Sequence, residues 1–436
     1  MPRPNDIVIS TSRNAGSTWA QGIVANLLWP DGERPATCSA TARKGGLQSD
    51  PSLTYPTRSL HEILNANRAR AALKFGLFFE IPVARPWTAH SELDAYQSTL
   101  AQAILADEVG FHSVWSVEHH FLEEYSHCSN PEVLYGAIAA RTERIRIGYG
   151  VRLLPKPYNH PIRTAESVAV LDLLSNGRVE FGTGRSSTRA ELEGFDVDPH
   201  ATRAMWSEAL RHIVGAWTED LYQADGEFWR MGAPRRVLPR PLQKPHPPLW
   251  GATSSPEGHH EIGKHGLGLC SFTVGVPPED LKDRLQLYRD GLAACAEPVG
   301  KFKNEQAATF TMVHCAESNA EAFADAAESF PWYVRTAVKH IASLPDWMSE
   351  LGSYGYAGQL KSVVDGGGLD HLTFDFLKDT GSAVVGDPAR CIEIARRYEA
   401  AGCDLLLCLV NPYKIPHDKV MRSIRLMGEQ VLPAFG

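Results

Sequence analysis

The sequence predicts an α/β fold in which eight strand–helix units close into a (β/α)₈ barrel. From Leu73 to the C-terminus, short apolar runs alternate with longer amphipathic runs, and glycine or Asn-Gly follows several of the longer ones. Glycine after an amphipathic run is typical of a helix C-terminus. Repeated strand-then-helix units favour a parallel sheet, and eight of them favour a closed barrel. An open, doubly wound sheet is the structural alternative.

The strands are expected at the short apolar runs. The first, Lys74 to Phe79, reads KFGLFF and has the composition of a buried strand. The second, at 112–117, reads HSVWSV. The full set of predicted strands is 74–79, 112–117, 145–151, a strand that starts at 179, 249–252, 267–272, 308–314 and 404–410.

The helices are expected at the amphipathic runs. In 92–109, apolar residues recur at helical spacing, and Gly110 follows as a stop signal. Pro131 and Pro161 stand in expected first turns, where the N–H that proline lacks has no helical partner. The predicted helices are 92–109, 131–141, 161–174, 202–217, 256–264, 279–296, 318–341, 388–400 and 418–432.

Two stretches interrupt the alternation. Residues 221–238 predict a β-hairpin around Ala224-Asp225-Gly226, and the Pro-rich stretch 239–248 follows it. Residues 343–386 are rich in Gly and Asp and weakly patterned, which predicts a long loop. Long loops inside compact domains are usually functional or disordered. Because this one precedes the last βα unit, we expect it to form a lid over the barrel mouth.

Charge and composition argue against several function classes. Lys and Arg total 43 against 51 for Asp and Glu, a net charge of −8. Phosphate-backbone binding needs a basic face, so nucleic acid is not the expected partner. No apolar run is long enough to span a membrane, and residues 1–10 lack the apolar core of a signal peptide. The eight cysteines form no C-x-x-C pair, which predicts free thiols and a cytoplasmic location.

Reactive side chains follow the second predicted strand, at the end where barrel enzymes have their active sites. Glu118, His119 and His120 are consecutive there. An imidazole beside a carboxylate can move protons near neutral pH. The alternative is a histidine pair that satisfies backbone groups of a loop. A metal site is disfavoured, because adjacent histidines diverge and do not have the spacing of ligands on one helix face.

A second group of residues predicts an anion pocket. Arg185 follows the fourth strand and two glycines, and arginine binds phosphate with two parallel hydrogen bonds. Thr253, Ser254 and Ser255 follow the next strand, at a helix start where free N–H groups attract anions. The alternatives are an ordinary turn with a surface arginine and an ordinary helix cap.

Together and in this order, these segments resemble the bacterial luciferase-like flavin monooxygenase family. The resemblance covers about residues 73–436 and implies a (β/α)₈ barrel of the luciferase type. The segments that carry it are 74–80, 110–121, 130–155, 160–185, 247–255 and 385–404.

The resemblance implies roles for individual residues. His119 matches a histidine that assists the oxygen chemistry beside the flavin, and Glu118 matches an adjacent acidic residue, so both are expected to be catalytic. The implied cofactor-binding residues are Gly150, Val151, Arg185, Thr253, Ser254 and Phe272.

Three of these roles are specific. Arg185 matches the arginine that grips the FMN phosphate, Phe272 matches an aromatic residue near the ring, and Gly150-Val151 matches a non-proline cis peptide under it. Bacterial luciferase has Glu where this chain has Thr253 and a reactive Cys where it has Gly184, so those two features do not carry over.

The resemblance also implies a two-component reaction. A separate reductase would supply reduced FMN, and O₂ would add to it to give a hydroperoxide that oxygenates a small apolar organic substrate. His119 would donate or accept the proton, and the lid would exclude water. A homodimer, or a heterodimer with a related chain, is expected through helices near the second and third βα units.

Other functions stay open at this point. One is a deazaflavin-dependent oxidoreductase of the same superfamily, which transfers hydride without oxygen. Another is a non-catalytic flavin-binding partner subunit, although the presence of His119 argues against it. A metal-dependent barrel hydrolase is a more distant alternative.

The first 72 residues lie outside the predicted barrel. Residues 3–28 resemble the start of a sulfotransferase, with a strand, a Gly-Ser-Thr turn and a helix. Arg13-Asn14-Ala15 stands where that family has a Lys, and so short a segment cannot bury that fold's core. We therefore expect a poorly ordered extension or a remnant, and no second activity.

Overall fold

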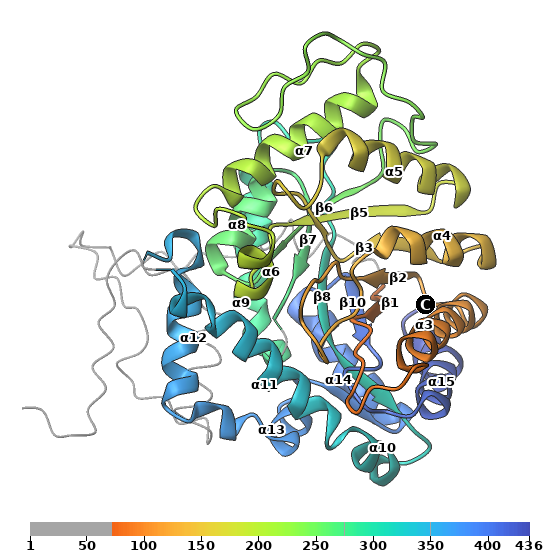
Figure 1. The fold of residues 1–436 in the computed structure, drawn as a ribbon. Coiled ribbons are helices and arrows are strands. Elements are labelled where there is room, and N and C mark those ends of the chain that lie inside the picture. The colour runs from red at the N-terminus through yellow and green to blue at the C-terminus, as the bar shows by residue number, and fades with distance from the viewer. Residues whose placement is uncertain (1–71, 274, 349) are drawn as a thin grey trace, which may run out of the picture.

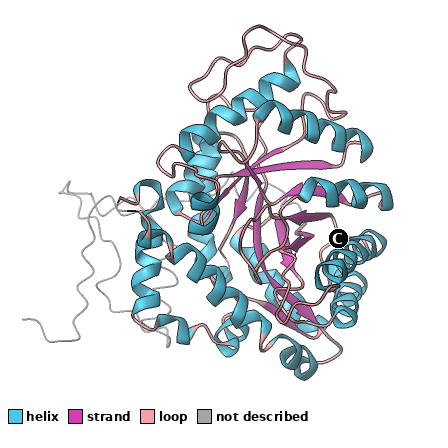
Figure 2. Ribbon diagram, viewed as in Figure 1, coloured by secondary structure: helices cyan, strands magenta, loops and turns pink. Residues whose placement is uncertain are grey.

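The computed structural model describes residues 72–273, 275–348 and 350–436, and in this part of the chain the strands close into a parallel barrel (Figures 1 and 2). Neighbouring strands pair in the order β10-β1-β2-β3-β5-β6-β7-β8, and β8 pairs with β10 to close the ring. The predicted eight-stranded barrel is confirmed, and the open sheet is excluded. The barrel strands are β1 (Lys74–Phe79), β2 (Ser113–Ser116), β3 (Arg146–Tyr149), β5 (Val179–Gly184), β6 (Leu249–Thr253), β7 (Gly268–Ser271), β8 (Ala307–Cys315) and β10 (Leu405–Leu409).

Helices surround the barrel and connect its strands (Figure 1). Except at the C-terminus, their bounds agree with the predicted ranges to within a turn. These outer helices are α3 (Ser91–Val109), α4 (Pro131–Arg141), α5 (Pro161–Leu174), α7 (Thr202–Thr218), α8 (Pro256–Lys264), α9 (Pro278–Ala294), α14 (Pro388–Ala401) and α15 (His417–Leu426).

Aromatic side chains fill the barrel interior. Trp115 in β2 and Trp250 in β6 meet edge to face, with ring centroids 5.3 Å apart. A Cβ on Gly148 in β3 would lie 2.1 Å from the Trp115 ring, so glycine leaves room there for the indole. Phe78 in β1 and Phe310 in β8 pack against each other nearby. The packed interior leaves space for a ligand only at the barrel mouth.

Two predicted helices differ from the observed ones. The helix expected over 318–341 is split into α10 (Asn319–Ala326) and α11 (Ser329–Ala342). Ala327 and Glu328 keep helical dihedral angles at the break, so the residue pattern does not mark it. The helix expected over 418–432 is regular only to Leu426 and continues as a π turn, Met427–Val431, and a 3₁₀ turn, Leu432–Ala434.

The segment predicted as a long loop, 343–386, is largely helical. It contains α12 (Gly355–Asp365), α13 (Phe374–Asp379), the 3₁₀ turns Leu344–Asp346, Gly352–Tyr354 and Gly368–His371, and the strand β9 (Val384–Gly386), which pairs with β8. Its hydrophobic periodicity is weak because the helices in it are short and each buries few residues. Helices α11 and α12 lie side by side next to the barrel (Figure 1), where they form one wall of the mouth.

The predicted hairpin at 221–238 has only two isolated antiparallel bridges, Tyr222–Arg235 and Asp225–Arg230. Besides these bridges, a contact with helix α7 holds the turn. The Glu208 carboxylate in α7 accepts hydrogen bonds from the backbone N–H groups at 227–229. The segment projects beyond the barrel at the top of Figure 1.

Three general features concern the described residues only. The cysteines among them, all except Cys38, are buried free thiols, as predicted. No helix in this part of the chain is long and apolar enough to cross a membrane. No group of three or more His, Cys, Asp or Glu side chains there is arranged to hold a metal ion.

Candidate active site

A cavity of about 640 Å³ opens at the C-terminal ends of the barrel strands. Every residue that the sequence placed at the flavin site lines it. Glu118 and His119 follow β2, Gly150 and Val151 follow β3, Arg185 follows β5, Thr253 and Ser254 lie at the end of β6, and Phe272 follows β7. Barrel closure therefore brings together residues from five different strand ends.

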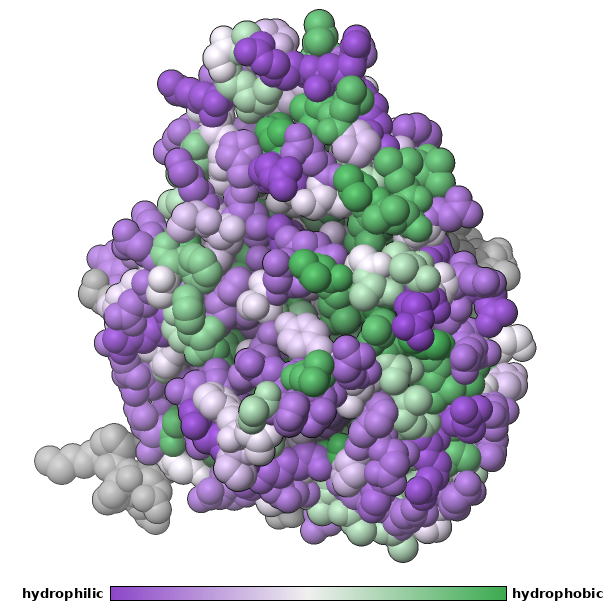
Figure 3. Space-filling view, turned by 45° about the vertical axis from the view of Figure 1, so that its right-hand side comes forward, coloured by the Kyte–Doolittle hydropathy of each residue, from purple (hydrophilic) through white to green (hydrophobic). Residues whose placement is uncertain are grey.

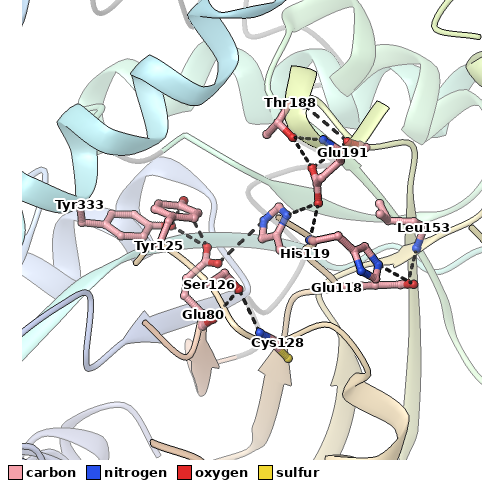
Figure 4. Close-up of polar contacts among 12 residues, drawn as sticks. Glu80, Glu118, His119, Tyr125, Ser126, Cys128, Leu153, Thr188, Glu191 and Tyr333 are labelled. Atoms are coloured by element: carbon pink, nitrogen blue, oxygen red, sulfur yellow. Dashed lines mark hydrogen bonds and ion pairs between the residues drawn. The ribbon is translucent and has the colours of Figure 1, made fainter. Parts of the chain in front are cut away.

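His119 lies on the cavity wall between two glutamates (Figure 4). Its Nδ1 is 2.8 Å from Glu191 Oε1, and its Nε2 is 3.8 Å from Glu80 Oε2. Burial by itself lowers the pKa of His119, but the Glu191 carboxylate and, to a lesser extent, Glu80 raise that pKa to about 9. The imidazole is therefore protonated at neutral pH.

Glu191 is fully buried and holds the loop that carries His119. It lies in the short helix α6 (Arg189–Gly194), and its carboxylate also accepts hydrogen bonds from the backbone N–H of His120 and from the hydroxyls of Ser186 and Thr188. Burial raises the pKa of Glu191, but His119 and the hydroxyls lower it below its usual value. An ionised Glu191 thus sets the orientation of the His119 ring.

Glu80 directly follows β1 and reaches the same histidine from the other side. Its Oε1 accepts a hydrogen bond from the hydroxyl of Tyr333 at 2.7 Å. The hydroxyl of Tyr125 donates to Tyr333 at 2.8 Å and lies 3.4 Å from Oε1. Burial raises the pKa of Glu80 above its usual value, although His119 and the tyrosines oppose the shift. Figure 4 shows this group beside His119.

Glu118 uses its carboxylate to hold a neighbouring segment. It accepts hydrogen bonds from the backbone N–H of Leu153 and the side-chain amide of Asn159, both at 2.9 Å, and lies 3.6 Å from Arg152. Leu153 belongs to β4 (Arg152–Leu153), which pairs with β5. These contacts engage both carboxylate oxygens of Glu118, which also lines the cavity.

His120 faces away from the cavity. Its ring stacks on Tyr158 at 6.1 Å and meets Phe195 edge to face at 4.8 Å. It is not among the residues that line the cavity. Of the adjacent histidines, only His119 reaches the site.

One end of the cavity is cationic and rich in hydroxyls. Arg185 donates hydrogen bonds to Thr202 and to Ser353, and its guanidinium lies 5.0 Å from the Tyr354 ring. Arg203 lines the same cavity. Because Ser353 and Tyr354 belong to the inserted segment, Arg185 joins the barrel to that segment.

Helix α8 points its N-terminus at this cavity. Ser255 is the N-cap and accepts a hydrogen bond from the backbone N–H of Gly258. The Thr253 hydroxyl hydrogen-bonds within the turn, to the backbone of Ser255. Ser254 also lines the cavity, so its hydroxyl and the α8 terminus can both reach an anion.

An apolar wall adjoins this end. The Gly150–Val151 peptide bond is cis, as predicted. A Cβ on Gly184 would lie 2.5 Å from Val151 Cγ2, so a larger residue at position 184 would clash with the Val151 side chain. Phe272 meets Phe310 edge to face at 5.5 Å, and both line the cavity.

Five residues of the His119 network were not predicted from the sequence. Glu80 had a usable signal, because it is a charged residue directly after a predicted strand. Thr188 and Glu191 match a capping-box pattern, which marks a helix start and says nothing of a histidine partner. Tyr125 and Tyr333 had no signal, because only folding brings them to Glu80.

Comparison with known proteins assigns the chain to a family. The model of the luciferase-like monooxygenase family matches residues 73–405. This chain belongs to the luciferase-like monooxygenase family. It is a flavin-dependent monooxygenase. The matched region begins where the barrel begins, and no comparison supports a sulfotransferase-like segment at residues 3–28, which lie outside the described residues.

Named relatives and a solved structure agree with this family. The chain is 28% identical to limonene 1,2-monooxygenase of Rhodococcus erythropolis, over 76% of this chain and 79% of that protein. It is 29% identical to the oxygenase component of the flavin-dependent trigonelline monooxygenase of Acinetobacter baylyi, over 48% and 57%. The crystal structure of the monooxygenase RslO1 from Streptomyces bottropensis superposes with a TM-score of 0.67 at 27% identity, over 84% and 100%.

Proposed function

We propose that this luciferase-like monooxygenase takes reduced FMN from a separate reductase and uses O₂ to oxygenate a small apolar organic molecule. The observation that carries the proposal is the make-up of the cavity at the barrel mouth. It combines a cationic, hydroxyl-rich end, an apolar aromatic wall and a protonated histidine, His119.

The residues at the barrel mouth fit FMN. Arg185, Ser254 and the N-terminus of α8 would hold the phosphate, because guanidinium and helix N–H groups both favour anions. Val151, on the cis peptide, and Phe272 would pack against the ring. When bound, reduced FMN supplies the reaction with O₂.

His119 would hold and move the proton that the oxygenation requires. Its Nδ1 is engaged by Glu191, so the proton available to the reaction is the one on Nε2. Glu118 would contribute through position alone, by keeping β4 in place beside the cavity.

The inserted segment would keep water away from the reaction. His340 and Ile341 at the end of α11 line the cavity together with Ser353 and Tyr356. The contact of Arg185 with Ser353 ties this wall to the phosphate end, so ligand binding and closure are coupled through one side chain.

The substrate wall supports an apolar substrate. Part of the cavity lining consists of uncharged apolar side chains, those of Phe272, Phe310 and Ile341. A two-component arrangement is supported by the relative from Acinetobacter baylyi, which is named as an oxygenase component. The buried free thiols support a reducing compartment, so we place the enzyme in the cytoplasm.

The test is an anaerobic titration with reduced FMN, followed by mixing with ¹⁸O₂ and a panel of terpenes, ketones and aldehydes. We expect saturable FMN binding and a product that carries one labelled oxygen. In His119→Ala, FMN binding should persist while product is lost. Binding of a deazaflavin in place of FMN, with hydride transfer and no labelled product, would show that the proposal is wrong.

We further propose that the chain forms a dimer through α4 and α5. These helices follow the second and third barrel strands, and Figure 3 shows apolar side chains gathered on that side of the molecule. The apolar residues exposed there, each by 42% or more, are Val133, Val170, Leu173 and Leu174. So much exposed apolar surface on two adjacent helices is typical of a protein interface.

A further inference from the structure

One oxygen of Glu80 has no hydrogen-bond partner although it is buried. The residue is only 3% exposed, and among the described residues no group donates to its Oε2. The nearest polar atom recorded for Oε2 is His119 Nε2, at 3.8 Å. Buried polar atoms are rarely left unpaired, and such atoms often mark a functional group.

The other oxygen of Glu80 is already hydrogen-bonded. Oε1 accepts a short hydrogen bond from the hydroxyl of Tyr333, and the hydroxyl of Tyr125, which donates to Tyr333, lies 3.4 Å from Oε1. Burial keeps the pKa values of both tyrosines well above their usual value, so the hydroxyls keep their protons and Tyr333 acts as a donor. An oxygen that already accepts a short hydrogen bond is a poorer place for a proton than one that accepts none. A proton on this carboxyl therefore belongs on Oε2, the oxygen that faces His119.

The charges around Glu80 favour an exchange with His119. The titratable groups that face the pair are Glu191, which pairs with the far side of the imidazole, Glu118, the buried thiol of Cys128, the two tyrosines, and His340, whose ring lies 5.2 Å from Tyr125. Burial lowers the pKa of His340 to about 4, so His340 is neutral. Burial raises the pKa of Glu80. A neutral Glu80 leaves Glu191, the larger cause of the raised pKa of His119, to balance the imidazolium, while Glu118 faces Arg152.

We propose that Glu80 is a positioning residue that restores the proton on His119 Nε2 after the imidazole has given one up in the cavity. The O–H bond at Glu80 Oε2 breaks and an N–H bond forms at His119 Nε2. The resulting carboxylate is stabilised by the O–H donor of Tyr333, which Tyr125 supports by donating to it, and the carboxylate regains a proton from water when the cavity reopens. This inference rests on the proposed function, because it needs a reaction that takes a proton from His119.

The first test uses the protein without cofactor. Infrared spectra of the wild type at neutral pH should show the C=O band of a buried protonated carboxyl, and Glu80→Gln should lack it. Glu92→Gln is the matched control, because Glu92 also pairs with a histidine, His127 at 2.8 Å, but lies exposed and outside the cavity. The control should keep the band. Absence of the band from the wild type would overturn the proposal.

The second test uses turnover with reduced FMN, O₂ and substrate. Glu80→Gln keeps the shape of the side chain and the acceptor for Tyr333 but has no proton to give. We expect kcat to fall by about 100-fold or more with KM and FMN affinity unchanged, because proton transfer by a positioned side chain contributes about 10²- to 10⁴-fold. Glu80→Asp, which keeps an acid, should restore part of the rate, and Glu92→Gln should match the wild type.

These outcomes separate the two proposals. Wild-type protein that binds no reduced FMN contradicts the proposed function and, with it, the role of Glu80. Normal wild-type turnover with an unchanged kcat in Glu80→Gln contradicts only the role of Glu80. Should Glu80→Gln not fold, Tyr333→Phe serves instead. Loss of that donor destabilises the carboxylate, so the infrared band should persist to higher pH than in the wild type.

Discussion

Nδ1 of His119 lies 2.8 Å from Oε1 of Glu191, a carboxylate that is completely buried. This pair decides which nitrogen of the imidazole serves the cavity, because Nδ1 is engaged and Nε2 is left. It also places a positive charge at the barrel mouth.

Replacement of Glu191 by Gln should lower the pKa of His119. The carboxylate is the main cause of the rise from the usual 6.5 to about 9, and Gln has no charge. Breaking a buried pair typically costs about 3 kcal/mol of unfolding free energy. We expect urea unfolding to show a loss of this size at pH 7 and NMR of the histidine ring to show the lower pKa.

The pH dependence of this effect has a definite sign. The pKa of His119 is raised in the folded state, so its stabilisation is complete below pH 6.5 and is lost as pH rises through about 9. The wild type should therefore lose stability over this interval more steeply than Glu191→Gln. Equal slopes for the two proteins would contradict the pairing.

Arg185→Ala should weaken binding of FMN but not of riboflavin. The guanidinium is expected to contact only the phosphate, which riboflavin lacks. A hydrogen bond to a charged group is worth about 1.5–3 kcal/mol, or roughly 10- to 100-fold in affinity. Fluorescence titration measures both constants. A parallel loss for riboflavin would mean that Arg185 acts by holding the inserted segment through Ser353, and Ser353→Ala should then show the same loss.

Ser254→Ala and Ser255→Ala should have different effects although the residues are adjacent. Ser254 lines the anion end of the cavity, so its loss should reduce FMN affinity several-fold and leave thermal stability unchanged. Ser255 caps α8, and removal of an N-cap costs about 1 kcal/mol of stability. The pair is checked by FMN titration and by thermal unfolding. Identical profiles for the two variants would contradict the separate roles.

Leu174→Glu should convert a dimer to a monomer. Leu174 is 66% exposed on α5, and a charge there would be buried without a partner in the proposed interface. Light scattering after gel filtration should report a mass of two chains for the wild type and one chain for the variant. Leu93→Glu, at a leucine of α3 that is 53% exposed, is the control and should stay dimeric. A monomeric wild type would show that the α4 and α5 surface serves another purpose.

Much of the barrel and of the candidate site could be predicted because the signals are local. Strand 74–79 and helix 161–174 appear at their predicted bounds, since each is a short run with its own period and its own end signals. His119, Arg185 and Ser254 could be placed at one site because each follows a strand, and parallel strands of a closed barrel end at the same rim.

The inserted segment and the hairpin region could not be predicted in the same way. Helices α12 and α13 are short and derive their order from packing against α11, so their residues carry little periodic pattern. The turn near Gly226 depends on Glu208, a residue of α7 that no pattern within 221–238 reveals.

By itself the sequence determined the order of the secondary structure, the barrel class and the rim on which the reactive residues stand. Only the tertiary structure decided which of those side chains contact one another and how the contacts shift their pKa values. Glu191 meets His119 from 72 positions away, and Tyr333 meets Glu80 from 253 positions away. The protonation of the imidazole depends on these contacts and on their burial. Distance and desolvation exist only after folding, so no reading of residue types along the chain contains them.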